Sequence, residues 1–413
     1  MGIWSCIGQD LQTVTENLKQ GRSGIIFDPQ RIEYGLHSGL TGNVPRPNLK
    51  PLLPRKYRVT MSEDAEYAYM AARQAFAQAG IEDGYLQENE MGVIFGNDGN
   101  SHIHDHQCVL YQERDSHMLG PNAIFQSMTS SVSMNIGTIF HLKGINMCVS
   151  SACASGNHAI GMAAMMIRQG MQDVILVGGS CSMDMKCDVV VDAIEAVSLR
   201  NDEPTKASRP FDKDRDGMIP SGGAAALVLE EYEHAIARGA TILAEVCGYG
   251  FSSNGIEDIS APSADAEYIA MKRALDDAGI LPSDIDYVNA HGTSTPIGDV
   301  EEAKALTQLF GANNKPYISS TKSMTGHEMW MAGASEAVYS LLMMQHGFVA
   351  PNINLQNKID EAKALNIVTE TVYTPIHTVL SNSSGMGGTN SALVFKAISS
   401  QQSVISDQPT TDN

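Results

Sequence analysis

Basic residues and long apolar runs are the two features that this chain most clearly lacks. Its 413 residues carry 27 Lys and Arg against 47 Asp and Glu, which gives a formal net charge of −20. A nucleic-acid-binding surface presents Lys and Arg to the phosphates, and anionic membranes attract the same side chains, so neither partner is expected. No apolar stretch approaches the roughly 18 residues that a membrane-spanning helix needs.

The sequence also lacks the signatures of secretion, lipidation and nucleotide binding. No basic region followed by an apolar run begins the chain, and Cys6 stands where a myristoylation pattern needs Ser or Thr. Neither a phosphate loop nor a Gly-x-Gly-x-x-Gly opening a helix is present, so no dinucleotide site is predicted. The seven cysteines are odd in number and lack zinc spacing, which is typical of reduced thiols in a cytoplasmic protein.

Two short segments resemble metal sites without completing one. Residues 212–217, DKDRDG, copy the start of an EF-hand loop, but Gly223 stands where the bidentate Glu belongs. Residues 101–108, SHIHDHQC, place three histidines and Cys108 on alternate residues, which could meet a metal on one face of a strand. Because clustered histidines in a polar segment are more often solvated, no metal is predicted.

What the sequence has instead is an internal repeat. Four segments recur in the same order: a short helix ending in Gly, a buried strand leading into small residues, a Ser-rich turn, and a Gly-rich strand. The pairs are AARQAFAQAGI (71–81) with MKRALDDAGI (271–280), GVIFGNDG (92–99) with DYVNAHGT (286–293), SSACASGNH from Ser150 with SSTKSMTGH from Ser319, and SGGAAALVLEE (221–231) with MGGTNSALVFKA (386–397). We therefore predict two related halves, residues 1–235 and 236–400, and a loose tail at 401–413.

Each half alternates strand and helix patterns, which predicts an α/β fold with mainly buried sheets. The run DVILVGG at 173–179 is apolar without alternation, as expected of a strand that is covered on both faces. Residues 153–169 carry Ala, Ile and Met on every side, which indicates a wholly buried helix. Two such helices, one from each half, can pack back to back between two sheets.

Cys153 stands out among the cysteines because it opens this buried helix. A thiol at a helix N-terminus is close to the positive end of the dipole and to free N–H groups, so we expect its pKa to be lowered. Its small neighbours, Ala152, Ala154, Ser155 and Gly156, leave room for a substrate to reach the sulfur. The other reading is a buried structural cysteine, which is the usual role of a cysteine taken alone.

Two histidines and a lysine are candidates to act with this thiol. His291 follows a predicted strand end, where open α/β folds place their chemistry. His327 and Lys322 lie in TKSMTGH, the second-half counterpart of the Cys153 turn, so the repeat predicts that both turns approach the centre of the molecule. A single histidine is more often a core residue, but this combination favours a catalytic centre.

These residues and their surroundings resemble the β-ketoacyl-acyl-carrier-protein synthases of the elongating, decarboxylating type. The resemblance covers nearly the whole chain and rests on SSACASG, KASRPFDKDRDG, NAHGTSTPIGD, TKSMTGH and GMGGTN, in the family's order. It implies the duplicated thiolase-like fold, layered α-β-α-β-α with two pseudo-symmetric halves. It also implies an acyltransferase of fatty-acid or related polyene or polyketide synthesis.

The resemblance implies a role for each matching residue. Cys153 would take the acyl group from an acyl carrier protein, with its own N–H and that of Met386 forming the oxyanion hole. His291 and His327 would hold the malonyl thioester as it loses carbon dioxide, and the resulting carbanion would attack the acyl group. Neutral imidazoles can donate hydrogen bonds where negative charge develops, without a metal.

The remaining implied residues support this centre. Lys322 and Glu336 would hold the histidines in position, and Thr293 and Thr295 would touch the 4′-phosphopantetheine arm of the carrier protein. No tightly bound cofactor is implied. The partners implied are an acyl carrier protein and a second subunit, in a homodimer or in a heterodimer with a related chain, because the family's fold buries a sheet edge between two subunits.

The chain departs from the family pattern at three places. Ser384 and Met386 replace two Phe residues, of which the second is thought to gate the acyl pocket. Because Met is flexible and Ser is small, we expect a roomier site, suited to chains such as rigid polyunsaturated ones. The chain also begins at the family's first Gly-rich turn, so we expect the usual first strand to be absent or the sheet edge to be built differently.

Three alternatives remain open beside a stand-alone synthase. The chain could be the active subunit of a specialised heterodimer for polyunsaturated chains. A non-catalytic partner subunit would lack the nucleophilic cysteine, and a thiolase would carry a second reactive cysteine near the C-terminal Gly-rich block, where GMGGTN has none.

The densest cluster of basic residues is an exception to the negative net charge of the chain. Arg55, Lys56 and Arg58 stand in RKYR, where the resemblance implies carrier-protein docking. Acyl carrier proteins are acidic, so a negatively charged enzyme needs a local basic patch to bind one. The alternative reading of this cluster is a solvated loop.

Overall fold

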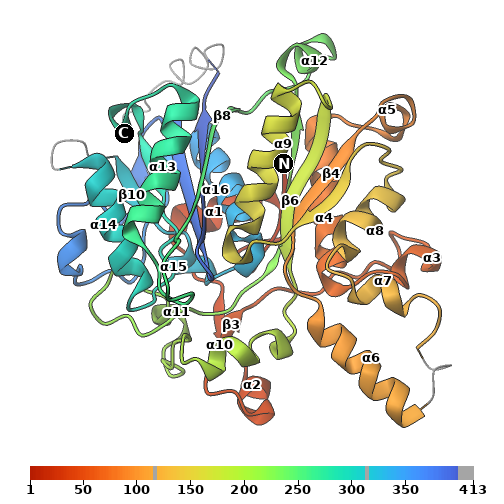
Figure 1. The fold of residues 1–413 in the computed structure, drawn as a ribbon, viewed down its shortest axis with the longest axis horizontal. Coiled ribbons are helices and arrows are strands. Elements are labelled where there is room, and N and C mark those ends of the chain that lie inside the picture. Colours follow the sequence, from red (N-terminus) through yellow and green to blue (C-terminus); the bar gives the residue numbers. More distant parts are fainter. Residues whose placement is uncertain (115–118, 312–315, 399–413) are drawn as a thin grey trace, which may run out of the picture.

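The computed structural model describes residues 1–114, 119–311 and 316–398, and two five-stranded sheets organise it (Figure 1). The first sheet has, in spatial order, β1 (Gly2–Trp4), β7 (Gly223–Glu230), β6 (Val174–Cys181), β4 (Gly92–Gly96) and β5 (Asn146–Val149). The second has β8 (Glu245–Ser253), β14 (Thr389–Lys396), β13 (Thr378–Gly385), β9 (Tyr287–Asn289) and β10 (Tyr317–Ser319).

The two sheets are built alike, strand for strand. In each, a central antiparallel pair, β6 with β7 or β13 with β14, is extended by two parallel strands on one side and one antiparallel strand on the other. This correspondence confirms the duplicated fold that the repeat predicted.

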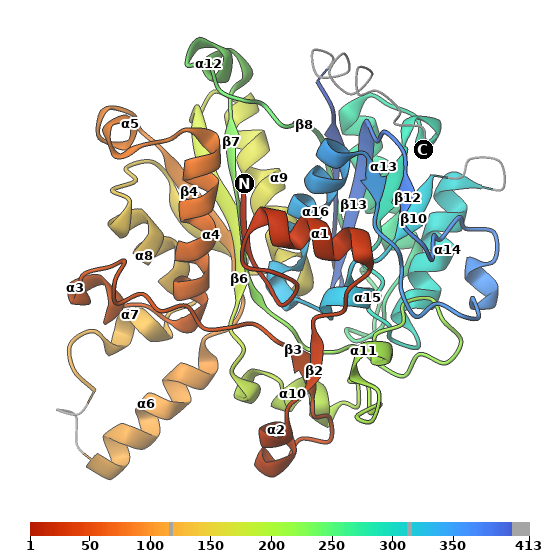
Figure 2. The same ribbon diagram turned by 180° about the vertical axis from the view of Figure 1, so that it is seen from behind.

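Two buried helices fill the space between the sheets, as the sequence predicted. They are α9 (Ser155–Arg168) and α16 (Ala332–His346), which pack against each other in the centre of Figure 1. Every residue of α16 from Ala332 to Met344 is buried, because the helix has sheet, helix or loop on all sides. On the face seen in Figure 2, α1 (Leu11–Gln20) lies against α16.

Helices on the outer faces complete the α-β-α-β-α layering. The first sheet is covered by α4 (Glu63–Ala79) and α8 (Ser131–Ile139), and the second by α13 (Ala264–Ala278) and α14 (Gly298–Phe310). The repeat is visible at the helix ends: Ser62 and Ser263 cap α4 and α13, which both end at a left-handed glycine. Such glycines stop a helix without steric cost.

The remaining elements lie on the surface or around the site, and all of them except α6 are short. The helices are α2 (Pro29–Tyr34), α3 (Arg55–Arg58), α5 (Asp83–Glu88), α6 (Ser101–Arg114), α7 (Ala123–Ser127), α10 (Val189–Ala193), α11 (Pro204–Ala207), α12 (Tyr232–Ala237) and α15 (Lys322–Thr325). The 3-10 turns within the described residues are η2 (Ala152–Ala154), η3 (Met185–Cys187), η4 (Pro282–Asp284), η5 (Met329–Met331) and η6 (Asp360–Ala362). Two small ladders pair β2 (Ile25–Phe27) with β3 (Leu40–Gly42), and β11 (Phe348–Val349) with β12 (Val372–Tyr373).

The His-rich segment forms a helix, so placing its side chains on one strand face was wrong. In α6 successive residues are about 100° apart, and alternate residues therefore point to different sides. His102 Nδ1 lies 3.1 Å from the Cys187 sulfur, whereas His104 Nδ1 lies 3.7 Å from that of Cys108. The four side chains do not converge.

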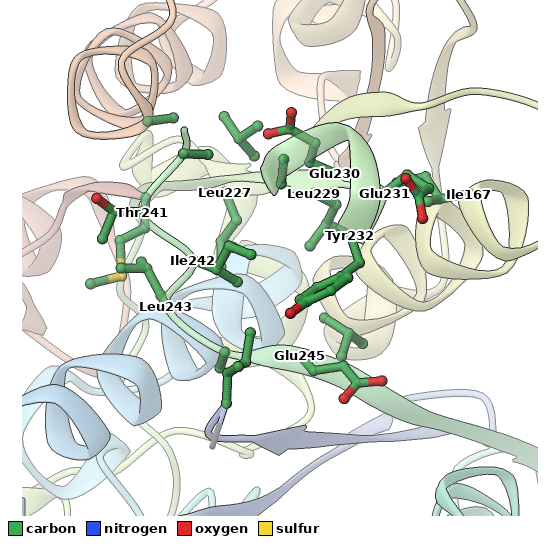
Figure 3. Close-up of a pocket in the computed structure, with 18 of the residues that line it drawn as sticks. Ile167, Leu227, Leu229, Glu230, Glu231, Tyr232, Thr241, Ile242, Leu243 and Glu245 are labelled. Carbon is green, nitrogen blue, oxygen red and sulfur yellow. The ribbon is translucent and has the colours of Figure 1, made fainter. Parts of the chain in front are cut away.

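The sheet edge for which the sequence predicted an absent first strand or a different construction carries a short strand. Gly2–Trp4 form β1, which pairs with Ala224–Ala226 of β7; three residues are too few to show a strand pattern in a sequence. Beyond this pairing, β7 continues beside a cavity of about 370 Å³, into which Leu227 and Leu229 project (Figure 3). Met1 lines this cavity, and its buried amino group, which donates to Gln78 Oε1 at 2.7 Å, has its pKa lowered to about 5.

The predicted tail at 401–413 lies outside the described residues. Within the part of the chain that the structure describes, no helix is long and apolar enough to cross a membrane.

Candidate active site

Cys153 lies in η2, the turn that leads from β5 into α9 at the centre of the molecule. The residue before it, Ala152, has φ 48, a left-handed conformation that non-glycine residues adopt rarely. Ser155 holds this turn by accepting a bond from the Ser151 N–H at 2.8 Å and donating to the Ala152 carbonyl at 2.6 Å. The strained turn thus aims a cysteine side chain from a rigid helix start.

The expected lowering of the Cys153 pKa was wrong. Burial raises the pKa of this thiol, and the N–H of Met386, the charge of Lys322 and the N–H of Cys153 itself only partly oppose this effect. The sequence showed that Cys153 stands at the start of a helix, but not how deeply its thiol is buried. The resting thiol is therefore protonated and needs a base before it can attack.

Two histidine rings surround the Cys153 sulfur. His327 Nε2 lies 3.0 Å from it, and the His291 ring stands edge-on to the His327 ring with centroids 5.3 Å apart. Burial lowers the pKa of His291 well below its usual value, and the charges of Lys322 and His327 lower it further. Burial and Lys322 have the same effect on the pKa of His327. Both imidazoles are neutral at physiological pH.

Lys322 lies behind the histidines, fully buried, and forms an ion pair with Glu336. Its Nζ is 3.3 Å from His291 Nδ1, and because an ammonium can only donate, this contact keeps the His291 proton on Nε2. Burial raises the pKa of Glu336 to about 7 although Lys322 lowers it. His327 Nδ1 has no partner among the described residues, so its Nε2 can accept a proton or donate one.

The loop that carries His291 is held by a carboxylate that the sequence analysis missed. Glu302, in the first turns of α14, accepts the N–H of His291 at 2.7 Å and that of Gly292 at 2.6 Å. Asp299 accepts the N–H of Ser294 at 3.0 Å in the same way. The signal was present, because acidic residues at the start of a helix commonly bind N–H groups of the preceding loop.

The predicted pantetheine residues lie in the same loop. The hydroxyls of Thr293 and Thr295 are 2.9 Å apart, and both side chains are half-buried. Met386 stands at the turn between β13 and β14, where its N–H faces the Cys153 sulfur and its side chain is 54% exposed. The Ser384 hydroxyl faces Glu267 on α13.

The repeat aligned the Cys153 turn with TKSMTGH, and the structure corrects the position of the helices. The strand ends of β5 and β10 correspond, but η2 before α9 matches η5 before α16, where Met329 has the same φ of 48. The second half therefore has α15 and His327 inserted between strand and helix. This insertion brings Lys322 and His327 to Cys153.

The three basic residues form α3, on the outside of the first half beside α7 and α8 (Figure 1). Arg55 and Lys56 are exposed, whereas Arg58 is half-buried and donates from Nε to the Leu53 carbonyl at 3.0 Å. Lys56 Nζ lies 4.6 Å from the centroid of the Tyr57 ring. Two of the three charges are thus free to meet a partner.

The Cys153, His291 and His327 side chains are the one group of three potential metal ligands found among the described residues. Their ligating atoms lie within 4.8 Å of one another. Neutral donors at this separation can instead bind one carbonyl oxygen beside the thiol.

The fold and this centre together define an enzyme of the thiolase-like fold with a cysteine and two histidines at the junction of its halves. Two family models match the chain, Beta-ketoacyl synthase, N-terminal domain, over residues 1–235 and Beta-ketoacyl synthase, C-terminal domain, over residues 243–356. The chain belongs to the beta-ketoacyl synthase family and is an acyltransferase.

Similar proteins extend over nearly the whole chain. 3-oxoacyl-[acyl-carrier-protein] synthase 1 of Haemophilus influenzae is 42% identical over 399 residues, 96% of this chain and 97% of that protein. The Escherichia coli K12 protein of the same name is 42% identical over 404 residues, with 96% and 98% covered. A solved β-ketoacyl synthase from Burkholderia phymatum has a TM-score of 0.90 at 35% identity, with 96% and 98% covered.

Proposed function

We propose that this enzyme condenses an acyl group, carried on Cys153, with malonyl-acyl carrier protein to give β-ketoacyl-acyl carrier protein, as in fatty-acid synthesis. The observation that carries the proposal is the buried group of one thiol and two neutral imidazoles, with His327 Nε2 3.0 Å from the sulfur. The family and the names of the relatives support the same reaction.

In the first half-reaction the protonated thiol of Cys153 meets an acyl thioester. His327 Nε2 accepts the thiol proton, the sulfur attacks the acyl carbon, and the pantetheine thiolate leaves and takes up that proton. The oxyanion of the tetrahedral intermediate accepts hydrogen bonds from the N–H groups of Cys153 and Met386, which already face the sulfur. The acyl group then remains on Cys153.

In the second half-reaction both histidines act as donors to the malonyl thioester, after His327, whose Nδ1 has no partner among the described residues, exchanges its proton from Nδ1 to Nε2 through water. As the carboxylate leaves as carbon dioxide, its bonding electrons move into the thioester, and the enolate oxygen accepts hydrogen bonds from the N–H groups of His291 and His327. The enolate carbon attacks the acyl carbon on Cys153, and the cysteine thiolate leaves and takes up a proton from water, which restores the resting thiol. Lys322 supports this step, because it holds the His291 proton on the nitrogen that faces the substrate.

The substrate arrives on a carrier protein. We propose that its 4′-phosphopantetheine arm passes Thr293 and Thr295, and that Arg55, Lys56 and Arg58 contact the acidic carrier surface. A structural neighbour at 28% identity and TM-score 0.86 is a type II polyketide synthase ketosynthase in complex with its acyl-carrier protein, which supports this mode of delivery. A cytoplasmic location stays a prediction.

We further propose that the enzyme is a dimer joined through β5. Among the described residues no strand pairs with the outer edge of β5, whose first residue, Asn146, is exposed. An open strand edge pairs readily with another strand. Light scattering tests this arrangement: twice the 44.4 kDa chain mass is expected, and a monomer at assay concentration would contradict it.

The alternatives are less favoured. A non-catalytic partner subunit would lack the nucleophilic cysteine, whereas this chain has a buried thiol beside two histidines and a lysine. A specialised heterodimer for polyunsaturated chains finds little support in Ser384, which faces α13.

Product analysis with carrier-bound substrates tests the proposal. The enzyme, an acyl-acyl carrier protein and malonyl-acyl carrier protein should give a β-ketoacyl product two carbons longer, with one carbon dioxide per product. Cys153→Ala should abolish the product, whereas Cys247→Ala, on the far strand β8, should not. Release of carbon dioxide without a longer product from the wild-type enzyme would contradict condensation.

A further inference from the structure

A second buried carboxyl group lies behind the His291 loop and has no part in the reaction described above. Glu267, in the first turns of α13, is 4% exposed, and its Oε2 has no hydrogen-bond partner among the described residues. The carboxyl group of Glu302 on α14 is close enough to act on it electrostatically. Two neighbouring buried carboxyl groups cannot both ionise at low cost, so such a pair holds a proton.

Strand β13 connects the two carboxyl groups to the active site. Side chains alternate along a strand, so Leu380, Asn382 and Ser384 share one face, and Leu380 packs among the core residues of α13 and α14. Asn382 Nδ2 donates to Glu302 Oε1 at 2.8 Å, and the Ser384 hydroxyl forms a hydrogen bond with Glu267. One strand face thus presents one polar side chain to each carboxyl group.

Each carboxyl group is connected to a segment of the active site, Glu302 to the His291 loop and Glu267 to the strand that leads to Met386. Glu302 binds the N–H groups of His291 and Gly292. Ser384 stands two residues before Met386, whose N–H faces the Cys153 sulfur. The pair of Glu267 and Glu302 therefore lies between the loop of the malonyl-binding histidine and the turn of the oxyanion hole.

We propose that Glu267 is a positioning residue that connects the His291 loop, through Glu302, to the Met386 turn, through Ser384. This inference rests on the proposed function, because it assigns the two connected segments their roles in condensation. Glu267 itself touches neither substrate nor the reacting atoms.

The surroundings decide which carboxyl group carries the proton. Burial raises the pKa of Glu267 well above its usual value, the neighbouring Glu302 raises it further, and the Ser384 hydroxyl only partly opposes this. Glu302 accepts three hydrogen bonds and faces Lys322, so it keeps the negative charge. The other charged groups that act on Glu267 are Glu301 and Asp299 of α14, of which Glu301 binds Lys304 and Asp299 faces Arg215.

The raised pKa of Glu267 determines how condensation and folding stability should change with pH. A carboxyl group whose folded pKa is raised stabilises the protein at low pH, and this stabilisation is lost as the pH rises through that pKa. Deprotonation of Glu267 would place a second negative charge beside Glu302 and loosen the His291 loop. Condensation and folding stability should therefore both decline on the alkaline side.

The experiment compares Glu267→Gln, Glu267→Ala and Asp64→Asn with the wild-type enzyme between pH 6 and 9.5. Asp64 is the matched control, because it is a fully buried carboxyl group in the first turn of α4, the counterpart of α13, and burial raises its pKa to about 8. The readouts are kcat and KM for malonyl-acyl carrier protein, the rate of Cys153 acylation, and the denaturant midpoint at each pH.

Glu267→Gln keeps the neutral, hydrogen-bonding form, so kcat near pH 7 should stay within about twofold of wild type while the alkaline decline of kcat disappears. Glu267→Ala should lower kcat by roughly tenfold with KM and Cys153 acylation little changed. Asp64→Asn should alter the pH dependence of stability but not that of kcat. Equal kcat profiles for wild type and Glu267→Gln, or equal losses in Glu267→Gln and Glu267→Ala, would overturn the proposal.

A second pair of variants tests the connection through the strand. Ser384→Ala removes the hydroxyl that meets Glu267, whereas Ser383→Ala makes the same change on the opposite face of β13. Only Ser384→Ala should lower kcat, and equal effects would overturn the proposed connection. If the wild-type enzyme shows no condensation, the proposed function fails, and the denaturant midpoints of Glu267→Gln still decide whether Glu267 holds a proton.

Discussion

Replacing Lys322 by Met should show separately how much the buried ion pair contributes to folding stability and how much to catalysis. The substitution removes a charge that is 1% exposed, together with its bonds to Glu336 and His291, and keeps most of the side-chain volume. Breaking a buried ion pair on one side typically costs about 3–5 kcal/mol, because the remaining charge is left unpaired. Glu336 can escape part of this cost by taking up a proton, since its pKa is about 7 even beside Lys322.

The loss of stability should therefore grow with pH. Without Lys322 the folded pKa of Glu336 rises further above its usual value, and a raised carboxyl pKa removes stability as the pH increases through the interval between the two values. Each unit of additional shift is worth about 1.4 kcal/mol. Urea denaturation at pH 5 and pH 8 should show a small destabilisation at the lower pH and one of several kcal/mol at the higher.

Catalysis should fall in Lys322→Met even where the protein is stable. His291 would lose the donor that keeps its proton on Nε2, and the loss of one hydrogen bond to a developing oxyanion costs on the order of 10²–10³ in rate. The assay is carbon dioxide release from malonyl-acyl carrier protein at pH 6, where the variant stays folded. Lys206→Met, an exposed lysine paired with Glu203, is the matched control. Wild-type release rates, or a destabilisation that is equal at pH 5 and pH 8, would refute the reasoning.

The remaining predictions concern the site, its partner and the core. His291→Ala should retain acylation of Cys153 but lose carbon dioxide release by about 10²-fold or more, and equal loss of both would contradict the assigned role. Reversing the charge of Lys56 should raise KM for the carrier protein several-fold and weaken its salt dependence; an unchanged KM would refute docking at α3. Met386→Phe should shift the preference among acyl chains in competition assays, and an unchanged preference would contradict its gating role. Gly156→Ala should destabilise the protein by about 1–3 kcal/mol in urea, because the added methyl would meet the Ala334 nitrogen at 2.7 Å, whereas Gly84→Ala, with open space around it, should not.

Much of the fold could be predicted because the chain is duplicated, so that segments of one half can be compared with their counterparts in the other. The helix capped by Gly80 and the one capped by Gly279 both begin after a capping serine and both cover the outer face of a sheet. The apolar helix that begins near Cys153 is buried or half-buried from Ser155 to Ala164, as predicted, whereas Met165 and Arg168 near its end are exposed. Its partner α16 lies where the repeat needed it, although an insertion displaces it along the chain.

What failed depends on distances that a sequence does not contain. The pKa of Cys153 is set by burial against nearby N–H groups and Lys322, and only the structure shows that burial prevails. The alternation along β13 directs the side chain of Ser384 to Glu267, a neighbour that the sequence does not indicate. The acidic start of α14 is visible in the sequence, but which groups Glu302 and Glu267 contact is visible only in the structure.

The measurement that tests the central claim most directly is the mass of the Cys153 peptide during a single turnover. Mixing the enzyme with an acyl-acyl carrier protein should add one acyl group to this peptide, and malonyl-acyl carrier protein should then discharge it into a β-ketoacyl product at the rate of carbon dioxide release. An acyl group on any other residue, or an acyl-Cys153 that persists while product forms, would contradict the account.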